Sequence, residues 1–317
     1  MSDPESGGLL LKLRQWFDSG EPDPDAPRQG AGETGVDWGR IVPFALMHLA
    51  CLFVFYVGVS ATAIAACVAM YLVRMFAITG FYHRYFSHRS FRTSRPAQFV
   101  FALLGASAVQ RGPIWWAAHH RHHHAFSDRP QDTHSPAQDG FLWAHMGWFL
   151  SKHHFHPDLR RVRDLLQYPE LRWLDRFDIL VPFVLALGLL LSGMALEQFA
   201  PQLGTTGGQL LVWGFFVSTV ACYHGTYTIN SLCHGWGSRR YQTKDDSRNN
   251  ALLALITLGE GWHNNHHHYP SAARQGFYWW EIDITYYLLR GLAALGVIWD
   301  LNQVPERIRD ARAASPA

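Results

Sequence analysis

The stretch His119-His120-Arg121-His122-His123-His124 places five histidines within six residues, and the fold has to accommodate them. Residues three and four positions apart share one face of an α-helix, so three of these histidines fall within about 100° of one another. They are His120, His123 and His124. The same spacing recurs far along the chain at His263, His266 and His267. Neutral imidazole is a good ligand for iron, zinc and copper, and the two faces therefore predict two halves of one metal site.

Four long apolar runs flank these histidine boxes. They are Ile41–Val59, Ala61–Gly80, Ile179–Leu196 and Leu210–Asn230. A helix needs about 20 apolar residues to cross a bilayer, and each run has a suitable length. Four buried helices of a soluble protein are the alternative, which the near absence of charge within the runs disfavours. We therefore predict an all-α integral membrane protein with four transmembrane helices.

The basic residues predict which side of the membrane holds the histidine boxes. Lys and Arg number four in residues 1–40, thirteen in residues 81–178 and nine in residues 231–317, whereas the linkers 57–60 and 197–209 have none. Basic residues favour the cytoplasmic side of a membrane. Both termini and all the boxes are therefore expected in the cytoplasm, where the boxes would form a helical cap on the four spans.

Composition divides the chain into three parts. Residues 1–37 are rich in Gly, Pro and Asp, which predicts a disordered cytosolic tail. Residues 38–301 form the predicted membrane domain, and residues 302–317 a polar tail. Within the domain, residues 99–109 are apolar but too short to span a bilayer, and residues 278–298 suit an amphipathic helix at the membrane surface.

Further histidines follow the ends of the second and fourth runs, which extends the metal site. The nine candidate ligands are His83, His88, His120, His123, His124, His234, His263, His266 and His267. One zinc ion uses three or four ligands, and so nine predict two metal ions. Asn230 lies one helical turn before His234 and could hold a metal-bound water. A structural histidine or an adventitious zinc patch would explain one box, but not several boxes on one membrane face.

The remaining composition narrows the chemistry. A net charge of +2 gives no basis for binding nucleic acid. The chain has no Ser-His-Asp arrangement, no phosphate-binding glycine loop and no HExxH zinc motif, which disfavours a hydrolase. Two redox metals where apolar helices meet the cytoplasm indicate oxygen chemistry on a lipid-like substrate.

Four motifs carry a resemblance to a known family. They are HRYFSH at His83–His88, HRHHHAFSD at His120–Asp128, NSLCH at Asn230–His234 and GEGWHNNHHHYP at Gly259–Pro270. From about Trp38 to Leu301 the chain resembles the membrane fatty acid desaturases, most closely the acyl-CoA (stearoyl-CoA type) Δ9 group. The resemblance implies a di-iron centre that reduces O2 with two electrons and inserts a cis double bond, expected at Δ9, into a long-chain acyl group.

The resemblance also implies how the ligands divide between the irons. The first iron would take His83, His88, His120, His124 and His267. The second would take His123, His234, His263 and His266, with Asn230 supporting its water. Carboxylates around the ligands are expected to accept the outward N–H groups of the imidazoles. The candidates are Asp128, Asp132 and Glu260.

Three aromatic residues are candidates for contact with the substrate. Tyr71 lies three helical turns before His83, where it could close an acyl tunnel between the second and fourth helices and limit chain length; a packing role is the alternative. Trp116 and Trp148 are the other two candidates. The segment that holds Trp148 also contains His134 and resembles a family segment that supports the ligands.

Two departures from the family leave the partners open. Eukaryotic acyl-CoA members place Arg-Asp just before the second box, where this chain has Ala118-His119. The resemblance to the acyl-CoA group favours acyl-CoA as the acyl carrier, and this departure leaves acyl carrier protein and phospholipid as alternatives. The sequence has no fused cytochrome b5, rubredoxin or ferredoxin motif. We expect a separate donor of one of these types with its reductase, and a bacterial inner-membrane location.

Two other functions compete with desaturation. A related membrane di-iron hydroxylase, decarboxylase or alkane monooxygenase would use the same kind of centre, although the box spacings favour the desaturase. A metal transporter would need ligands at mid-membrane. Only His48 and His224 lie inside the predicted spans, which disfavours the transporter.

Overall fold

The computed structural model describes residue 14 and residues 16–20 and 35–311, and these are mostly helical. Strands β1 (Arg92–Thr93) and β2 (Ile298–Trp299) form a short antiparallel pair. Most of the predicted N-terminal tail lies outside the described residues, as does 312–317 of the C-terminal tail. The described residues 16–20 contact the domain, since Asp18 pairs with Arg176 at 2.7 Å.

The first two predicted spans form a helical hairpin. The first consists of α2 (Trp38–Ala50), η1 (Cys51–Phe53) and α3 (Val54–Val57). Gly58 then turns the chain with a φ of +69°, a backbone conformation that residues other than glycine rarely adopt. The second span begins with α4 (Ala61–Phe76), where the Ser60 hydroxyl caps the helix by accepting the Ala63 N–H at 3.1 Å.

Three helices of the described chain are long and apolar enough to cross a membrane. They are Trp38–Val57, Ala61–Ser87 and α10 (Leu180–Phe199). Their side chains are largely uncovered by protein, as Phe55 (88 % exposed) and Phe199 (84 % exposed) illustrate. Exposed apolar surface of this extent fits a lipid environment. These three helices match the predicted spans at 41–59, 61–80 and 179–196, whereas residues 99–109 and 278–298 provide no such helix, as expected.

The fourth predicted span, residues 210–230, is helical but is not among these three. The elements α11 (Gly207–Gln209), η7 (Leu210–Val217) and α12 (Ser218–Ser231) follow one another without a break. The second half carries polar side chains such as His224, Thr226 and Asn230, which lower its hydropathy. By composition, and not by length, this helix therefore differs from the other three.

A π-helical segment extends the second span toward the histidines. This segment, η2 (Ala77–Ser87), continues α4, and all eleven of its residues are buried. His88 follows as its C-terminal cap, so His83 and His88 lie at the end of the long helix. Helix α5 (Arg95–Ala106) packs closely on η2 because Gly105 leaves room for the Tyr82 ring, which a Cβ atom would overlap. The π-helix therefore lies in the core, where its side chains are held firmly.

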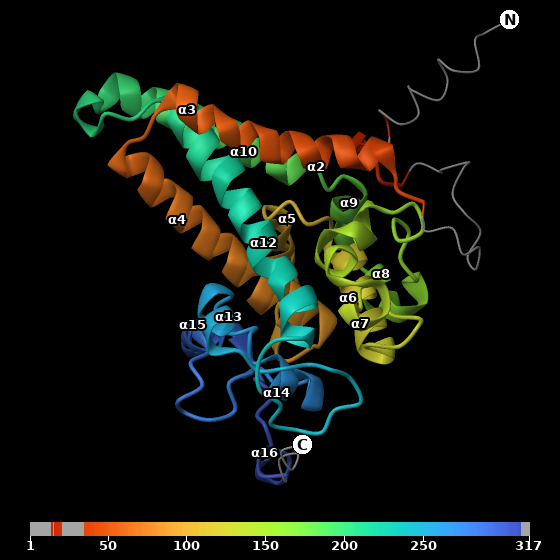
Figure 1. Ribbon diagram of the computed structural model, residues 1–317. Coiled ribbons are helices and arrows are strands. Elements are labelled where there is room, and N and C mark those ends of the chain that lie inside the picture. The colour runs from red at the N-terminus through yellow and green to blue at the C-terminus, as the bar shows by residue number, and fades with distance from the viewer. Residues whose placement is uncertain (1–13, 15, 21–34, 312–317) are drawn as a thin grey trace, which may run out of the picture.

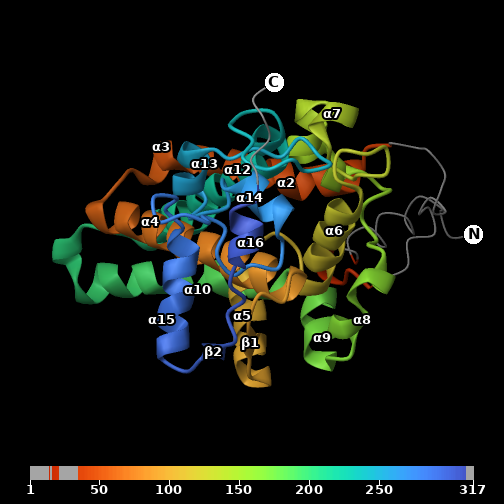
Figure 2. The same ribbon diagram turned by 90° about the horizontal axis from the view of Figure 1, so that it is seen from below.

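The remaining helices gather at the end of the molecule opposite α3. They are α5 (Arg95–Ala106), α6 (Pro113–Phe126), α7 (Pro136–Asp139), η3 (Trp143–Gly147), η4 (Trp148–Leu150), η5 (Leu159–Val162), α8 (Arg163–Leu166), α9 (Pro169–Arg176), η8 (Leu232–His234), α13 (Ala251–Ile256), α14 (His263–His268), α15 (Ile284–Ala294) and α16 (Glu306–Arg309). The short helix η6 (Pro201–Leu203) is the exception and follows α10. Helices α4 and α12 run side by side toward α14, while α2 and α10 cross the top of the view (Figure 1). Seen from below, α6 and α14 are neighbours although they are far apart in the sequence (Figure 2).

Candidate metal centre

Nine buried or half-buried histidines converge where α6 and α14 meet the ends of η2 and η8. They form two groups, and within each group the candidate ligand atoms lie within 4.8 Å of one another. The first group contains His83, His88, His120, His124 and His266. The second contains His123, His234, His263 and His267. All nine histidines predicted from the boxes are therefore brought together.

Helical position explains how the box on α6 divides. His120 and His124 are four residues apart, about 40° around a helix, and their ring centroids are 4.6 Å apart in the first group. His123 points to the other side, with its ring 6.3 Å from that of His120, and it joins the second group. One helical turn thus supplies both groups.

The same geometry corrects the predicted division of the box on α14. His263 and His267 are four residues apart and their ring centroids are separated by 4.4 Å, so both belong to the second group. His266 points away from them into the first group, where its Nε2 lies 3.0 Å from that of His83. The prediction that His267 joins the first group and His266 the second was wrong. In both boxes the first and last histidines stay together and the middle one crosses over.

The ring nitrogens meet in a way that fits bound metal. The Nε2 atoms of His88 and His120 are 2.7 Å apart, and those of His234 and His263 are 3.1 Å apart. His234 uses its Nδ1–H to donate to Asp128, which leaves only a lone pair at Nε2. Converging lone pairs repel one another unless a cation lies between them. The donor set therefore suits two metal ions held by neutral imidazoles.

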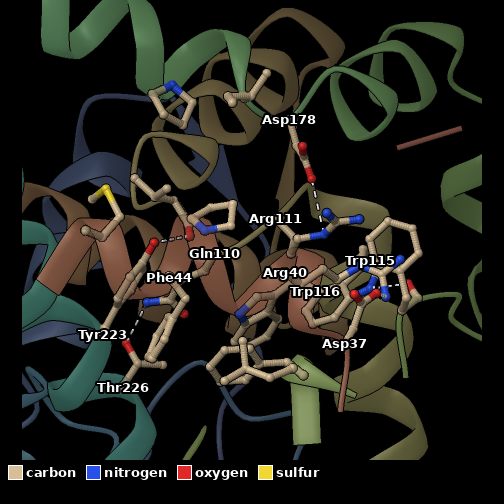
Figure 3. Close-up of a pocket in the computed structure, with 18 of the residues that line it drawn as sticks. Asp37, Arg40, Phe44, Gln110, Arg111, Trp115, Trp116, Asp178, Tyr223 and Thr226 are labelled. Carbon is tan, nitrogen blue, oxygen red and sulfur yellow. Dashed lines mark hydrogen bonds and ion pairs between the residues drawn. The ribbon is translucent and has the colours of Figure 1, made fainter. Parts of the chain in front are cut away.

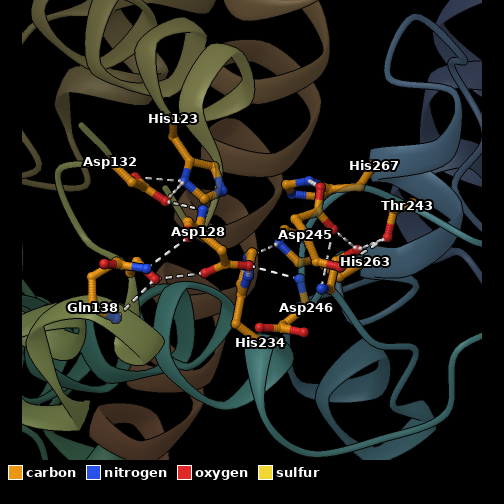
Figure 4. A network of polar contacts seen from close by, with 12 residues as sticks. His123, Asp128, Asp132, Gln138, His234, Thr243, Asp245, Asp246, His263 and His267 are labelled. Carbon is orange, nitrogen blue, oxygen red and sulfur yellow. Dashed lines mark hydrogen bonds and ion pairs between the residues drawn. The ribbon is translucent and has the colours of Figure 1, made fainter. Parts of the chain in front are cut away.

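Four carboxylates hold the outward nitrogens of the ligand candidates. Nδ1 of His234 lies 2.7 Å from Asp128, Nδ1 of His123 lies 3.0 Å from Asp132, and Glu260 contacts Nδ1 of His83. These are the three carboxylates expected from the sequence. Asp245 is a fourth, which the sequence reasoning missed, and it lies 2.8 Å from Nδ1 of His267 (Figure 4). Such pairs fix the tautomer and turn Nε2 toward the metal.

Burial and these carboxylates determine the charges at the site. Burial lowers the pKa of His120 and that of His266 well below the usual value for histidine, so both rings are neutral. Burial would raise the pKa of Asp128, but the hydrogen bond and charge of His234 outweigh it and lower that pKa to about 2. Neutral rings with ionised carboxylates behind them are the protonation states that metal binding requires.

Comparison with known proteins identifies the family. The family model described as fatty acid desaturase matches residues 59–299, which is most of the chain. The chain belongs to the fatty acid desaturase family. The resemblance read from the histidine boxes is thereby confirmed, and the protein is an oxidoreductase that acts on fatty acyl groups.

Curated relatives of this desaturase carry several specificities. A palmitoyl-monogalactosyldiacylglycerol Δ7 desaturase of Arabidopsis thaliana is 35 % identical over 271 residues, 84 % of this chain and 69 % of that protein. An acyl-CoA C20 Δ5 desaturase of Anemone leveillei is 35 % identical over 266 residues, covering 83 % and 80 %. An sn-1 stearoyl-lipid 9-desaturase of Anabaena variabilis is 34 % identical over 265 residues, covering 83 % and 92 %.

A cavity of about 740 Å³ reaches the metal centre of the desaturase. It lies between α2, α6, α10 and α12, and aromatic side chains such as Phe44, Trp115 and Tyr223 line it (Figure 3). His120 of the first group is also part of the lining. A chamber that ends at a candidate metal ligand suits a substrate that reacts there.

The cavity brings three of the predicted residues together. Trp116, Trp148 and Asn230 all line it, and the Trp116 ring stacks on His120 at a centroid distance of 5.0 Å. Tyr71 does not line it, because its hydroxyl donates to the Ile256 carbonyl at 2.7 Å. This cavity also lies beside α2 and α10 rather than beside the second span, so the placement of Tyr71 gives no support to a role in limiting chain length.

His119 is the second residue of the pair Ala118-His119, which stands where the acyl-CoA desaturases are expected to carry Arg-Asp. Its ring lies 4.4 Å from that of Trp115, and it lines the cavity. Burial lowers the pKa of His119 well below its usual value, and among the described residues its Nε2 has no hydrogen-bond partner. This part of the wall is therefore neutral.

Replacing Asp245 by asparagine is expected to weaken metal binding by about 10–100-fold, the usual cost of losing an outer carboxylate. An amide cannot stabilise the Nδ1–H of His267 as a carboxylate does. Iron retained during titration with a chelator measures the effect. Asp246→Asn is the matched control, because that side chain approaches Arg239 at 3.6 Å and not a histidine. Equal losses in both variants would contradict the role of Asp245.

Proposed function

We propose that this desaturase uses two iron ions and O2 to insert a cis double bond at Δ9 of a long-chain acyl group, with electrons from a separate carrier. The observation that carries the proposal is the pair of all-histidine groups, of which His120 lines a cavity with largely apolar and aromatic side chains. The position of the double bond rests on relatives named as 9-desaturases, from Anabaena variabilis and Arabidopsis thaliana.

The two histidine groups, Trp116 and Asn230 would have different roles in this reaction. The two histidine groups would each hold one iron, and bound iron would supply the oxidising power to break C–H bonds after O2 is reduced. Neutral ligands leave the metals more positive than the carboxylates of soluble di-iron proteins do. Trp116 forms the cavity wall beside His120 and would position the acyl chain there. Asn230, on the same wall, would hold a water near the second group.

The reaction requires more than the chain itself supplies. For an acyl segment –CH2–CH2–, the overall change is –CH2–CH2– + O2 + 2e⁻ + 2H⁺ → –CH=CH– + 2H2O. Two electrons must arrive from a donor of the ferredoxin, rubredoxin or cytochrome b5 type and its reductase. Burial of the centre would keep bulk water from competing with the substrate.

We also propose a membrane arrangement with four crossings in a bacterial inner membrane. The unbroken helix from Gly207 to Ser231 would serve as the fourth span beside α4. The excess of Lys and Arg outside the two short linkers supports cytoplasmic termini and a cytoplasmic helical cap. In this arrangement residues 38–301 form the membrane domain between the tails 1–37 and 302–317.

Two features favour a membrane lipid as the acyl carrier over the acyl-CoA expected from the motifs. The lining of the cavity includes Leu46 of α2 and Phe183 of α10, which are 55 % and 63 % exposed on the lipid-facing helices. A chain could therefore enter sideways from the bilayer. The neutral wall at His119 also lacks the charged pair of the acyl-CoA group. Relatives with both acyl-CoA and acyl-lipid names exist.

The test is to reconstitute the iron-loaded protein in lipid nanodiscs with a reductant. Deuterated stearoyl groups are supplied either as stearoyl-CoA or at sn-1 of a phospholipid, and the products are analysed by mass spectrometry. An alkene at one fixed position supports the proposed function. An alcohol or a shortened alkene would instead indicate the hydroxylase or decarboxylase. Product from the phospholipid arm supports the lipid carrier, and product from stearoyl-CoA alone contradicts it.

A bulky residue in the cavity should shorten the preferred acyl chain. Ala186 of α10 lines the cavity, so Ala186→Phe would remove space that the chain occupies. We expect the ratio of C16 to C18 product to rise by about 10-fold, the discrimination that one or two methylenes provide in an apolar pocket. Val184→Phe is the control, because Val184 is 59 % exposed on the same helix and does not line the cavity. An unchanged ratio in Ala186→Phe would exclude this cavity as the acyl site.

A further inference from the structure

A second pocket reaches the metal centre from another direction. It has a volume of about 290 Å³ and shares no lining residue with the large cavity. Its lining consists of His124, Ala125, Ser127, Arg129, Gln242, Thr243, Lys244, Asp245, His267 and His268. The large cavity is mainly apolar in its lining, whereas this pocket is mainly polar, so a different kind of partner is expected there.

The pocket ends at the histidine pair that joins the two groups. His124 belongs to the first group and His267 to the second, and both line the pocket. Their rings are stacked with centroids 4.4 Å apart and planes inclined by 24°. Other ring contacts between the groups are longer, such as His266–His267 at 5.6 Å and His123–His124 at 5.7 Å. An electron that arrives at this pair is close to both metal positions at once.

The outer part of the pocket is positively charged. Arg129 and Lys244 both line it and both are exposed. The carboxylate in the lining, Asp245, is engaged by His267 at 2.8 Å and by the Ser247 hydroxyl. The charge offered to solvent is therefore that of the two cations. Such a rim attracts an acidic surface and repels a basic one.

We propose that this pocket is the docking site of an acidic one-electron carrier protein, and that electrons enter the centre through the His124–His267 pair. The inference rests on the proposed function, which requires two electrons for each double bond. A one-electron carrier supplies them in two successive visits, and the carrier is oxidised once at each visit. The pocket is too small for a protein domain, so the carrier would cover the rim and bring its redox centre close to the stacked rings.

Reversal of the two rim charges tests the docking site. In the variant Arg129→Glu/Lys244→Glu, an acidic [2Fe–2S] ferredoxin should bind at least about 10-fold more weakly than to the wild type at low salt, and the difference should shrink as salt is added. Carbodiimide should cross-link Lys244 of the wild type to carboxylates of the ferredoxin. Arg92→Glu/Arg160→Glu is the matched control, because each of these side chains is 75 % exposed outside the pocket.

A second measurement separates this inference from the proposed function. Chemically reduced methyl viologen replaces the ferredoxin, and alkene formation is measured in wild type and both double variants. Equal turnover in all three is expected, together with equal iron content, because the rim is not needed by a small reductant. A wild type that forms no alkene with viologen refutes the proposed function. If the ferredoxin binds wild type and the Arg129→Glu/Lys244→Glu variant equally, or binds neither, the docking inference is overturned.

Discussion

Replacing His266 by alanine is expected to abolish desaturation and to reduce bound iron toward one ion per chain. His266 contacts both His83 and His124 through Nε2, at 3.0 Å and 2.9 Å, so it lies at the middle of the first group. Because this side chain is buried, a water molecule from solvent cannot readily replace the lost nitrogen donor. Since even outer partners of metal ligands cost about 10–100-fold, we expect a loss of activity above about 100-fold.

Iron analysis with Mössbauer spectra distinguishes the two groups. His266→Ala should lose the signal of one iron environment, and His267→Ala should lose that of the other. His122→Ala is the control from the same histidine-rich stretch, because its Nε2 contacts the Gln131 carbonyl at 2.7 Å and it belongs to neither group. If His266→Ala and His267→Ala remove the same signal, the division of the groups is wrong.

Replacing Arg84 by methionine is expected to destabilise the fold by about 3–5 kcal/mol, the cost of leaving a buried charge without its partner. The side chain is 1 % exposed and pairs with Glu260 and with Asp283, each at 2.9 Å. Glu260 also contacts His83 of the first metal group. Loss of Arg84 would therefore leave two buried carboxylates unbalanced and loosen the support of a ligand candidate.

Melting followed by tryptophan fluorescence in detergent measures this effect. We expect Tm to fall by about 10 °C, at about 2–4 °C for each kcal/mol. Arg95→Met is the control, because Arg95 pairs with Glu170 at 2.7 Å with 60 % of its side chain exposed. Exposed pairs contribute about 0–1 kcal/mol, so its Tm should hardly change. Equal falls in Tm in the two variants would show that the buried network around Arg84 stabilises the fold no more than the exposed Arg95–Glu170 pair does.

Local patterns in the sequence were sufficient to locate the long apolar helices and the nine histidines that the structure brings together. Hydropathy located three helices that are long and apolar enough to cross a membrane, because crossing a bilayer requires about 20 consecutive apolar residues. The spacing of the histidine boxes identified the nine histidines because helical periodicity places side chains within a single turn. Residues 210–230 are helical as predicted, but their polar second half lies against other helices, and their role as a fourth span stays a prediction.

Contacts between distant segments decided the rest. Asp175 of α9 accepts the backbone N–H groups of Ile114 and Trp115, both at 2.9 Å, and so fixes the start of the helix that carries the second box. Nothing near either segment indicates this pairing. Asp245 escaped notice for the same reason, since it lies in a polar loop 22 residues before His267.

By itself, then, the sequence determined that the protein has long apolar helices and histidine boxes with helical spacing, because both follow from the spacing of neighbouring residues. Only the tertiary structure decided that His266 and His267 serve opposite groups, because that depends on which helix each ring faces. It also decided that the cavity lies among α2, α10 and α12 rather than beside Tyr71. Packing between segments far apart in the chain creates such sites, and no local pattern records it.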